Sequence, residues 1–338
     1  MALGLRRNQA LALASITKDQ FYYHPKAGKR GKVASKTTKY RTQENWKEVA
    51  NQEVIEQIKA QLSEPDLNYG YRKMSYFLQQ SGYWINHKKV YRLMKAQGLL
   101  QPKKVRQAKN YVKYRMVVPK GPLEVLEMDI KHIWVEEYRR YAYNLTILDT
   151  FTRAALYFEV GYNMRQAQVK RAWEYVIEHH LQPADALNRK LHIEVRNDNG
   201  PQFSAKMIQK FFNDNGLNQV FTHPYTPQEN GHVESFHGIL AKHLNERTFW
   251  TLGQLEQDLA LFYERYNHTR IHASIAHLSP HNFWRLWEMK QIDRIEKARK
   301  KVQFKLKIPY YLLKESFGLY EPEGSCLLQS KGLEALKD

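Results

Sequence analysis

Hydrophobic side chains in the second third of the chain recur first at strand spacing and then at helix spacing. Strand-like runs cover Leu123 to Ile133, Tyr141 to Leu148 and Ala154 to Val160, and Tyr138-Arg139-Arg140 marks a turn after the first run. A helical stripe from Val169 to Leu181 follows. The pattern predicts three consecutive strands and a helix that covers them.

The next segment alternates between strands and helices. Leu191 to Val195 predicts a short buried strand, and Ser204 to Asn215 predicts a helix capped by Ser204. A brief strand at Val220-Phe221 precedes a proline-rich turn. Two helices follow, over about Glu229–Arg247 and Leu252–His268. This order of elements predicts an α/β domain with a mixed sheet and helices on its faces, of the ribonuclease H type.

The first third of the chain has a different pattern. Residues 4–24 predict one or two short helices, residues 26–45 are rich in Lys, Gly, Thr and Ser as in a linker, and residues 46–62 predict a helix. Two short helices then flank a turn at Ser81-Gly82, and the second runs from about Asn86 to Gln97. We expect an all-α helix-turn-helix region that binds DNA.

The second helix of this pair carries side chains that can reach phosphates and base edges, namely His87, Lys88, Lys89, Tyr91, Arg92 and Lys95. Any helical hairpin with a polar outer face gives the same pattern, so the surrounding charge is what favours DNA. A connector from Pro102 to Lys120 follows with seven Lys and Arg residues.

The net charge of +19 is concentrated in the first third. Residues 1–120 hold 25 Lys and Arg against 7 Asp and Glu, which gives +18, whereas residues 121–280 come to −3 and residues 281–338 to +4. A basic region beside a nearly neutral one indicates a polyphosphate partner. A solvated basic surface or an anionic membrane is the alternative, but no basic amphipathic helix with a wide aromatic face favours the membrane.

The composition excludes several classes of protein. A single cysteine, Cys326, cannot form an intramolecular disulfide or a zinc site with paired thiolates. No apolar run approaches the roughly 18–20 residues that span a bilayer. The hydrophobic fraction of 43% is enough for packed cores. These features favour a cytoplasmic protein without a membrane partner.

The predicted domain organisation has four parts. They are a short helical segment and basic linker over residues 1–45, a helix-turn-helix domain and basic connector over 46–120, a catalytic core over 121–285, and a C-terminal helix and tail over 286–338. The last part follows from a helical pattern over Asn282 to Lys301 and a strand-like Val302–Ile308. No function is predicted for it.

Three acidic residues stand out in the α/β region. Asp129 lies within the first strand, Asp198 lies just beyond the strand that ends at Val195, and Glu234 lies in the helix after the proline-rich turn. A charge in a strand is costly unless it meets a partner or a cation. Three such acids can form an oxygen-rich pocket for two Mg²⁺ ions, which clamp both oxygens of a displacement at phosphorus.

Each acid taken alone also has a plain structural interpretation. Asp129 could keep an edge strand soluble, Asp198 could be a turn residue, and Glu234 could be an exposed helix position. Asp149, at the end of the second strand, is a fourth contender that spacing does not exclude.

Several motifs resemble a known family. The blocks at residues 198–203 (DNGPQF), 227–236 (PQENGHVESF) and 266–272 (YNHTRIH) look like the retroviral-integrase superfamily. More narrowly, the chain resembles the second reading-frame product of insertion sequence three family transposases. Tyr69 to Arg72 with Asn86 to Met94 resembles the helix-turn-helix that precedes the core there. The resemblance covers about residues 46–285.

The resemblance implies roles for individual residues. Asp129, Asp198 and Glu234 would be the metal-binding catalytic acids, with two Mg²⁺ ions per site and Mn²⁺ as a substitute. Asp149 would be structural. The residues expected to contact DNA are Tyr71, Arg72, His87, Lys88, Lys89, Arg92, Asn230 and Lys242. Asn230 lies one helical turn before the glutamate and so faces the same side of its helix.

The chain departs from the family pattern at a few positions. A basic residue usually stands seven positions after the glutamate, where this chain has Ala241. Lys242 follows, but one helical step of about 100° turns it off the face of Glu234. Asn197 stands where a serine is more usual. A His/Cys zinc module, as in retroviral integrases, cannot be built with one cysteine, so helices must bind the DNA ends.

The implied activity is that of a DNA transposase. Hydrolysis of a phosphodiester at the element end frees a 3′-hydroxyl, which then attacks a phosphodiester of another strand. The implied partners are double-stranded DNA, both terminal repeats and target, a homo-oligomer on paired ends, and the first reading-frame product or a fusion with it. The expected location is the bacterial cytoplasm, on the nucleoid. A catalytically silent DNA-binding regulator and a nuclease that cuts without joining are the alternatives.

Overall fold

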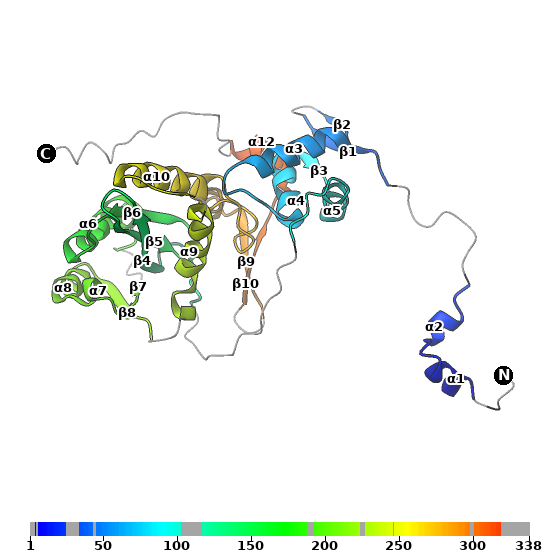
Figure 1. Cartoon of the computed structure of the whole chain (residues 1–338), viewed down its shortest axis with the longest axis horizontal. Helices are drawn as coiled ribbons and strands as arrows, with labels where there is room; N and C mark the ends of the chain where they lie inside the picture. Colours follow the sequence, from blue (N-terminus) through cyan, green and yellow to red (C-terminus); the bar gives the residue numbers. More distant parts are fainter. Residues whose placement is uncertain are drawn as a thin grey trace. The chain divides into compact units, whose positions relative to one another are not determined.

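The structure, a computed structural model, describes residues 4, 6–24, 34–42, 45–102, 117–187, 192–223, 227–245, 247–297 and 301–318. The chain divides into two compact units, Met1–Lys36 and Thr37–Asp338. The first unit holds two short helices, α1 (Arg7–Leu13) and α2 (Lys18–Phe21), as the sequence predicts (Figure 1). The Thr17 hydroxyl caps α2 by accepting a hydrogen bond from Gln20 N.

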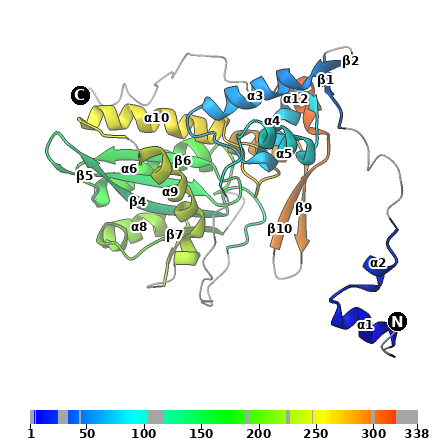
Figure 2. The ribbon, with the colours of Figure 1, turned by 45° about the vertical axis from the view of Figure 1, so that its right-hand side comes forward.

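A five-stranded sheet forms the centre of the second unit (Figure 2). Its strands are β4 (Val125–Val135), β5 (Arg140–Asp149), β6 (Ala155–Gly161), β7 (Ile193–Asn197) and β8 (Leu217–Phe221). The spatial order is β6-β5-β4-β7-β8. The first three strands are antiparallel, and β4, β7 and β8 are parallel. The predicted ribonuclease H-like mixed sheet is confirmed.

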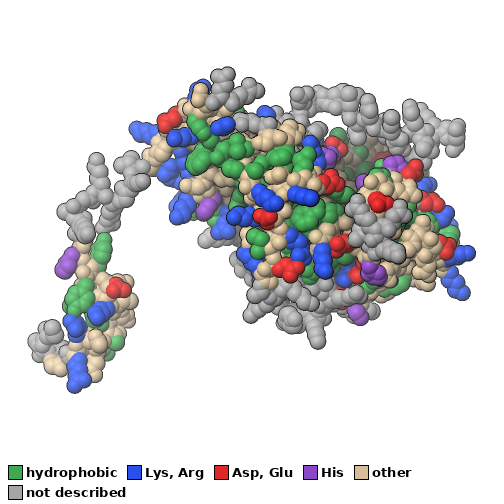
Figure 3. Space-filling model, turned by 180° about the vertical axis from the view of Figure 1, so that it is seen from behind, with side chains coloured by type: hydrophobic (Ala, Val, Ile, Leu, Met, Phe, Trp, Pro, Cys, Tyr) green, Lys and Arg blue, Asp and Glu red, His purple; other side chains and the backbone are tan. Residues whose placement is uncertain are grey.

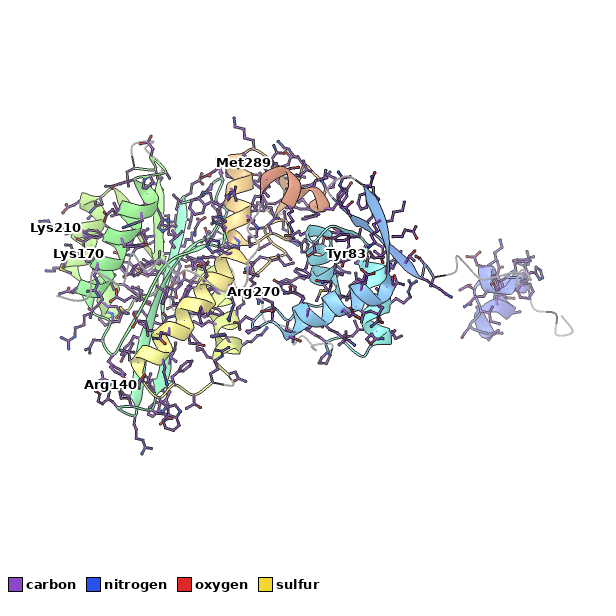
Figure 4. All side chains as sticks on the ribbon, turned by 90° about the horizontal axis from the view of Figure 1, so that it is seen from above. Tyr83, Arg140, Lys170, Lys210, Arg270 and Met289 are labelled. Atoms are coloured by element: carbon purple, nitrogen blue, oxygen red, sulfur yellow. The ribbon has the colours of Figure 1, made fainter. Side chains whose placement is uncertain are left out.

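Helices cover both faces of this sheet. One face packs against α6 (Gln166–Val176), its π-helical continuation (Ile177–Leu181), α7 (Pro201–Ser204) and α8 (Lys206–Asp214). The other face packs against α9 (Gly231–Leu244), which follows a 3-10 turn at Pro227–Asn230, and against α10 (Leu252–His268). Figure 4 shows these layers, with Lys170 and Lys210 on the outer helices of the first face.

The helix-turn-helix region is not all-α, contrary to the prediction. It contains a small antiparallel sheet of β1 (Thr37–Arg41), β2 (Trp46–Ala50) and β3 (Tyr83–Trp84) beside three helices, α3 (Asn51–Ser63), α4 (Tyr71–Gln80) and α5 (His87–Ala96). The predicted helix over 46–62 therefore begins only at Asn51, and the predicted linker contains a strand. Tertiary pairing overrides the local pattern, because Val49 pairs with Thr38 and both are buried.

Two other predicted helices differ from the structure. Ser204 ends α7 instead of capping a long helix, because Ala205 is extended and separates α7 from α8. The helix predicted from Asn282 to Lys301 is α11 (Pro280–Glu288), after which Lys290 has a left-handed backbone with φ of 57°. The chain then forms the hairpin of β9 (Ile292–Lys297) and β10 (Lys301–Leu306).

The remaining described elements are a 3-10 turn at Tyr310–Leu312 and α12 (Leu313–Phe317). Parts of the predicted linker, the basic connector and the C-terminal tail with Cys326 lie outside the described residues. Within the described part of the chain, no helix is long and apolar enough to cross a membrane.

Candidate active site and nucleic-acid interface

Asp129 lies on the face of β4 that looks toward α9. Side chains alternate along a strand, so Leu126 and Met128 enter the core beneath α6, while Glu127 and Asp129 point the other way. Asp129 Oδ1 accepts a hydrogen bond from Ile130 N at 2.8 Å. Its Oδ2 lies 3.3 Å from His237 Nδ1 of α9, and the Asp129 side chain remains 25% exposed.

Asp198 lies beside Asp129 because β4 and β7 are parallel neighbours. Glu127 pairs with Arg196, and both acids come two residues later on their chains. The pKa of Asp198 is raised by partial burial and by the negative charge of Asp129, against the hydrogen bond that Gly200 N donates to Asp198 Oδ1 at 3.0 Å. The predicted strand-end position of Asp198 is therefore found, and Asp198 lies within electrostatic reach of Asp129.

Glu234 is exposed in the first turn of α9. A buried acid that the sequence analysis missed, Glu127, joins this end of α9 to β4. Glu127 Oε2 accepts hydrogen bonds from His232 N at 2.8 Å and Val233 N at 2.7 Å, and Glu127 Oε1 lies 2.7 Å from His232 Nδ1. Burial raises the pKa of Glu127 to about 7, although the Val233 N–H and nearby Arg153 and Arg196 oppose the shift. An acid at the start of a helix also suits the helix dipole.

Two more side chains of this helix segment lie at the site. Asn230 is buried and its Nδ2 donates to Met128 O at 3.4 Å. Asn230 Oδ1 and His237 Nε2 are buried and have no hydrogen-bond partner among the described residues. Because they stand four residues before and three after Glu234, both lie on its side of the helix. His237 was not predicted as a site residue, although its position one turn from the glutamate was a usable signal.

The donor set fits a divalent cation in its chemistry. Hard cations take carboxylate and amide oxygens, and a cation relieves the repulsion by which Asp129 raises the pKa of Asp198. The buried Asn230 Oδ1 supplies an unsatisfied oxygen at the same place. Within the described residues, however, no three His, Cys, Asp or Glu side chains form a group that would hold a metal ion. Among the three acids, a direct electrostatic effect is seen between Asp129 and Asp198.

Asp149 has the structural role that the resemblance implies. It is fully buried at the end of β5 and accepts hydrogen bonds from Leu123 N, Phe151 N, Thr152 N and Thr152 Oγ1. Its carboxylate thereby holds the turn into β6 and has no approach to solvent.

The predicted DNA-contact residues of the helix-turn-helix lie close together. Asn86 caps α5, because its Oδ1 accepts from Lys89 N at 2.9 Å. Tyr71 of α4 packs against the rings of His87 and Tyr91, and Arg72 lies over the Tyr71 ring. His87, Lys88 and Arg92 are exposed, whereas Lys89 also donates to Thr37 O. Figure 3 shows Lys and Arg side chains over this part of the unit, next to exposed hydrophobic ones.

Lys242 is exposed and lies away from Asp129, on the side of α9 nearer α4. Its charge acts on Lys73 of α4, whose pKa burial and the charges of Arg270 and Lys242 lower to about 8. Arg270 (labelled in Figure 4) donates to Asp66 O. His272 is buried against the Tyr266 ring. Arg270 and His272 thus contact other parts of the protein itself.

Comparisons with known proteins agree with this arrangement. Two models described as an integrase core domain match residues 119–227 and 215–280, and a model described as an HTH-like domain matches residues 49–107.

Similar proteins come from insertion elements. The chain is 27% identical over 233 residues to a protein of insertion element IS407 from Burkholderia multivorans, covering 68% of this chain and 80% of that protein. It is 27% identical over 287 residues to InsK of insertion sequence element IS150 from Escherichia coli, which carries the name of a transposase, covering 81% and 91% of the two chains. Among solved structures, the catalytic core domain of BIV integrase is a distant likeness, with 20% identity, a TM-score of 0.36, and coverage of 50% and 97%.

An integrase core behind an HTH-like domain defines a nucleotidyl-transferase type of enzyme that acts on DNA. The chain is similar to insertion-element transposases and matches such a core.

Proposed function

We propose that Asp129, Asp198 and Glu234 are the catalytic acids of this transposase and that together they bind two Mg²⁺ ions, or Mn²⁺ in their place. The observation that carries the proposal is the influence of Asp129 on Asp198 across two parallel neighbouring strands, beside the first turn of the helix that bears Glu234. When bound, the ions would activate the attacking oxygen and stabilise the leaving oxygen at phosphorus.

The chain's own residues hold and orient these acids. Ile130 N and His237 Nδ1 fix the two oxygens of Asp129, and Gly200 N fixes one oxygen of Asp198. Glu127 ties the start of α9 to β4, which sets the distance between Glu234 and the aspartates. Asn230 Oδ1 is buried at the same place and has no hydrogen-bond partner among the described residues. The reaction is cleavage at the element end and transfer of the new 3′-hydroxyl into target DNA.

The DNA-binding part of the proposal rests on the helix-turn-helix. The exposed side chains of α5, namely His87, Lys88 and Arg92, would contact the terminal repeat, with Tyr71 and Arg72 of α4 beside them. Lys89, on the same helix, would also contact the DNA, although it donates a hydrogen bond to Thr37 O. Lys242 would contact the DNA farther from the acids. Two ends must be held at once, so the working form is a homo-oligomer on paired ends, with the first reading-frame product as a further partner.

The test uses the full chain and duplexes that carry either end of the element encoding the protein. Asp129→Asn, Asp198→Asn and Glu234→Gln should each reduce strand transfer with Mg²⁺ by at least about a thousandfold. Binding to the same duplexes without divalent ions should be unchanged. The exposed Asp214→Asn on α8 is the matched control and should retain full activity.

Three results would overturn parts of the proposal. Substantial activity in any one of the three acid variants would remove that residue from the site. No nicking by the wild type under any divalent ion would favour a DNA-binding regulator. Cut fragments without target-joined products would favour a nuclease.

A further inference from the structure

A cavity of about 310 Å³ lies between the outer part of β4 and the second half of α9. These are the two elements that carry Asp129 and Glu234. The residues that line the cavity include Lys131, Trp134, Glu136, Ala241, Arg247 and Phe249. None of them is among the residues proposed above for catalysis or DNA binding.

Lys131 continues the row of side chains that contains Asp129. Residues two apart on a strand point the same way and lie about 6.6 Å apart. Along this row, Glu127 contacts His232 and Asp129 contacts His237, so the row runs in the same direction as α9. Lys131, the next residue of the row, therefore lies at the level of Ala241, and both line the cavity. A DNA strand that left the acids along α9 in this direction would pass over Lys131.

Among the described residues that line the cavity, Arg247 has an ionic partner, whereas Lys131 has none. Arg247 forms an ion pair with Asp258, and Glu136 accepts a hydrogen bond from Trp134 Nε1 at 2.9 Å. Lys131 makes no ion pair within the described residues. Ala241 is exposed and its methyl group leaves the space in front of Lys131 open.

We propose that Lys131 binds a DNA backbone phosphate next to the scissile one, in the cavity that the small side chain of Ala241 leaves open. The inference rests on the proposed function, because it takes the acids as the place of cleavage. Lys131 is a positioning residue: its ammonium group neutralises a neighbouring phosphate and fixes the register of the strand over Asp129.

The test measures binding of the full chain to an element-end duplex without divalent ions, over a series of salt concentrations. Lys131→Ala should weaken binding about tenfold and reduce the slope of log affinity against log salt by about 1. Lys131→Arg should keep both values near those of the wild type. Lys210→Ala on α8, on the opposite face of the sheet (Figure 4), is the matched control and should change neither.

A second variant separates phosphate binding from a loss of folding. Ala241→Lys places an ammonium group on the other wall of the same cavity, so it should restore affinity and slope in the Lys131→Ala background. Duplexes with one neutral methylphosphonate near the cleavage point locate the contact. At one such position, the neutral group should weaken binding by the wild type. The same duplex should bind the Lys131→Ala variant no more weakly than the unmodified duplex does.

Unchanged affinity and salt slope in Lys131→Ala would overturn the inference, and so would a methylphosphonate effect that is the same in both proteins at every position. Failure of Ala241→Lys to restore binding would assign Lys131 a structural role. Because binding is measured without metal ions, these outcomes are independent of the activity test of the three acids.

Discussion

The two faces of the five-stranded sheet differ in the polarity of the side chains that they carry. Toward α6 and α8, β4 and β5 present mainly apolar side chains, among them Leu126, Met128 and Ile147, packed around Trp173. Toward α9 and α10, the same strands present Glu127, Asp129, Asn144 and Thr146. Asn144 Nδ2 donates to Tyr263 Oη, which also shares a hydrogen bond with Thr146 Oγ1. Asn144 Oδ1, Asn230 Oδ1 and His237 Nε2 on this side have no partner among the described residues.

The difference shows how one sheet separates stability from function. The apolar face supplies hydrophobic stabilisation without polar penalties. The polar face keeps charged and unsatisfied groups where a ligand can reach them, at a cost in stability. It extends through α9 toward α4. There His243 lies between Asp66 and Asp258 at 2.6 to 2.9 Å, and the half-buried Lys73 of α4 lies near Arg270.

The largest expected effect is on the apolar face. Trp173 is completely buried in α6 and its ring packs edge-on against Phe212. Trp173→Ala should lower the free energy of unfolding by about 3–5 kcal/mol, because a large cavity cannot collapse in a packed interior. Urea unfolding followed by circular dichroism measures it.

The exposed Trp250→Ala is the control for this change. Trp250 is 65% exposed, so its loss should change stability by no more than about 0.5 kcal/mol. Equal losses in the two variants would contradict the assignment of stability to the apolar face.

The next effect concerns Lys73 and pH. Its pKa in the folded protein is about 8, below its ordinary 10.5, because burial and the charges of Arg270 and Lys242 disfavour the ammonium form. The unfolded chain therefore binds more protons than the folded one between these values. The free energy of unfolding should rise with pH from about 8 to 10.5, by up to about 3 kcal/mol from this group.

Lys73→Met isolates that contribution. The variant should be more stable than the wild type at pH 7, and the advantage should vanish above pH 10.5. Thermal melts at several pH values give the difference between the two proteins. An advantage that stays constant across this range would show that Lys73 is charged in the folded protein.

The smallest expected change in free energy is in the activation barrier for strand transfer at the polar face. His237→Ala removes the ring that holds Asp129 Oδ2 and should reduce strand transfer about 10–100-fold, as loss of a group that orients a metal ligand does. Its stability should change by less than about 1 kcal/mol. His237→Asn, which can still donate to the carboxylate, should recover part of the activity. A loss of stability as large as that of Trp173→Ala would make His237 a packing residue instead.

The spacing of hydrophobic residues predicted the α/β core of this protein well, because burial of side chains there follows that spacing closely. The alternation of Leu126 and Met128 with Glu127 and Asp129 is visible in the sequence, and the strands and helices around it were found. Periodicity failed for β1, β2 and β9, in each of which only one residue is buried. β1 and β2 pair with each other, and β9 pairs with β10, as hairpins. These strands are stabilised largely by backbone pairing, so few buried side chains mark them in the sequence.

The candidate site was predictable only in part. Asp129, Asp198 and Glu234 stand at positions that strand ends and motifs indicate. Glu127 and His237 were missed because their importance lies in contacts between β4 and α9, which are about a hundred residues apart in the sequence. The sequence also did not predict that Lys131 and Ala241 line one cavity, because they too are distant in the sequence. A search for buried acids two residues from a predicted catalytic acid would have found Glu127.

The most direct test of the central claim is anomalous diffraction from crystals of the full chain soaked in Mn²⁺. The polar face should bind two Mn²⁺ ions, with oxygens of Asp129, Asp198 and Glu234 as ligands, and the apolar face should bind none. Asp198→Asn crystals treated in the same way should lose at least one of the ions. Mn²⁺ bound elsewhere, or no Mn²⁺ at these three acids under conditions that support strand transfer, would contradict the account.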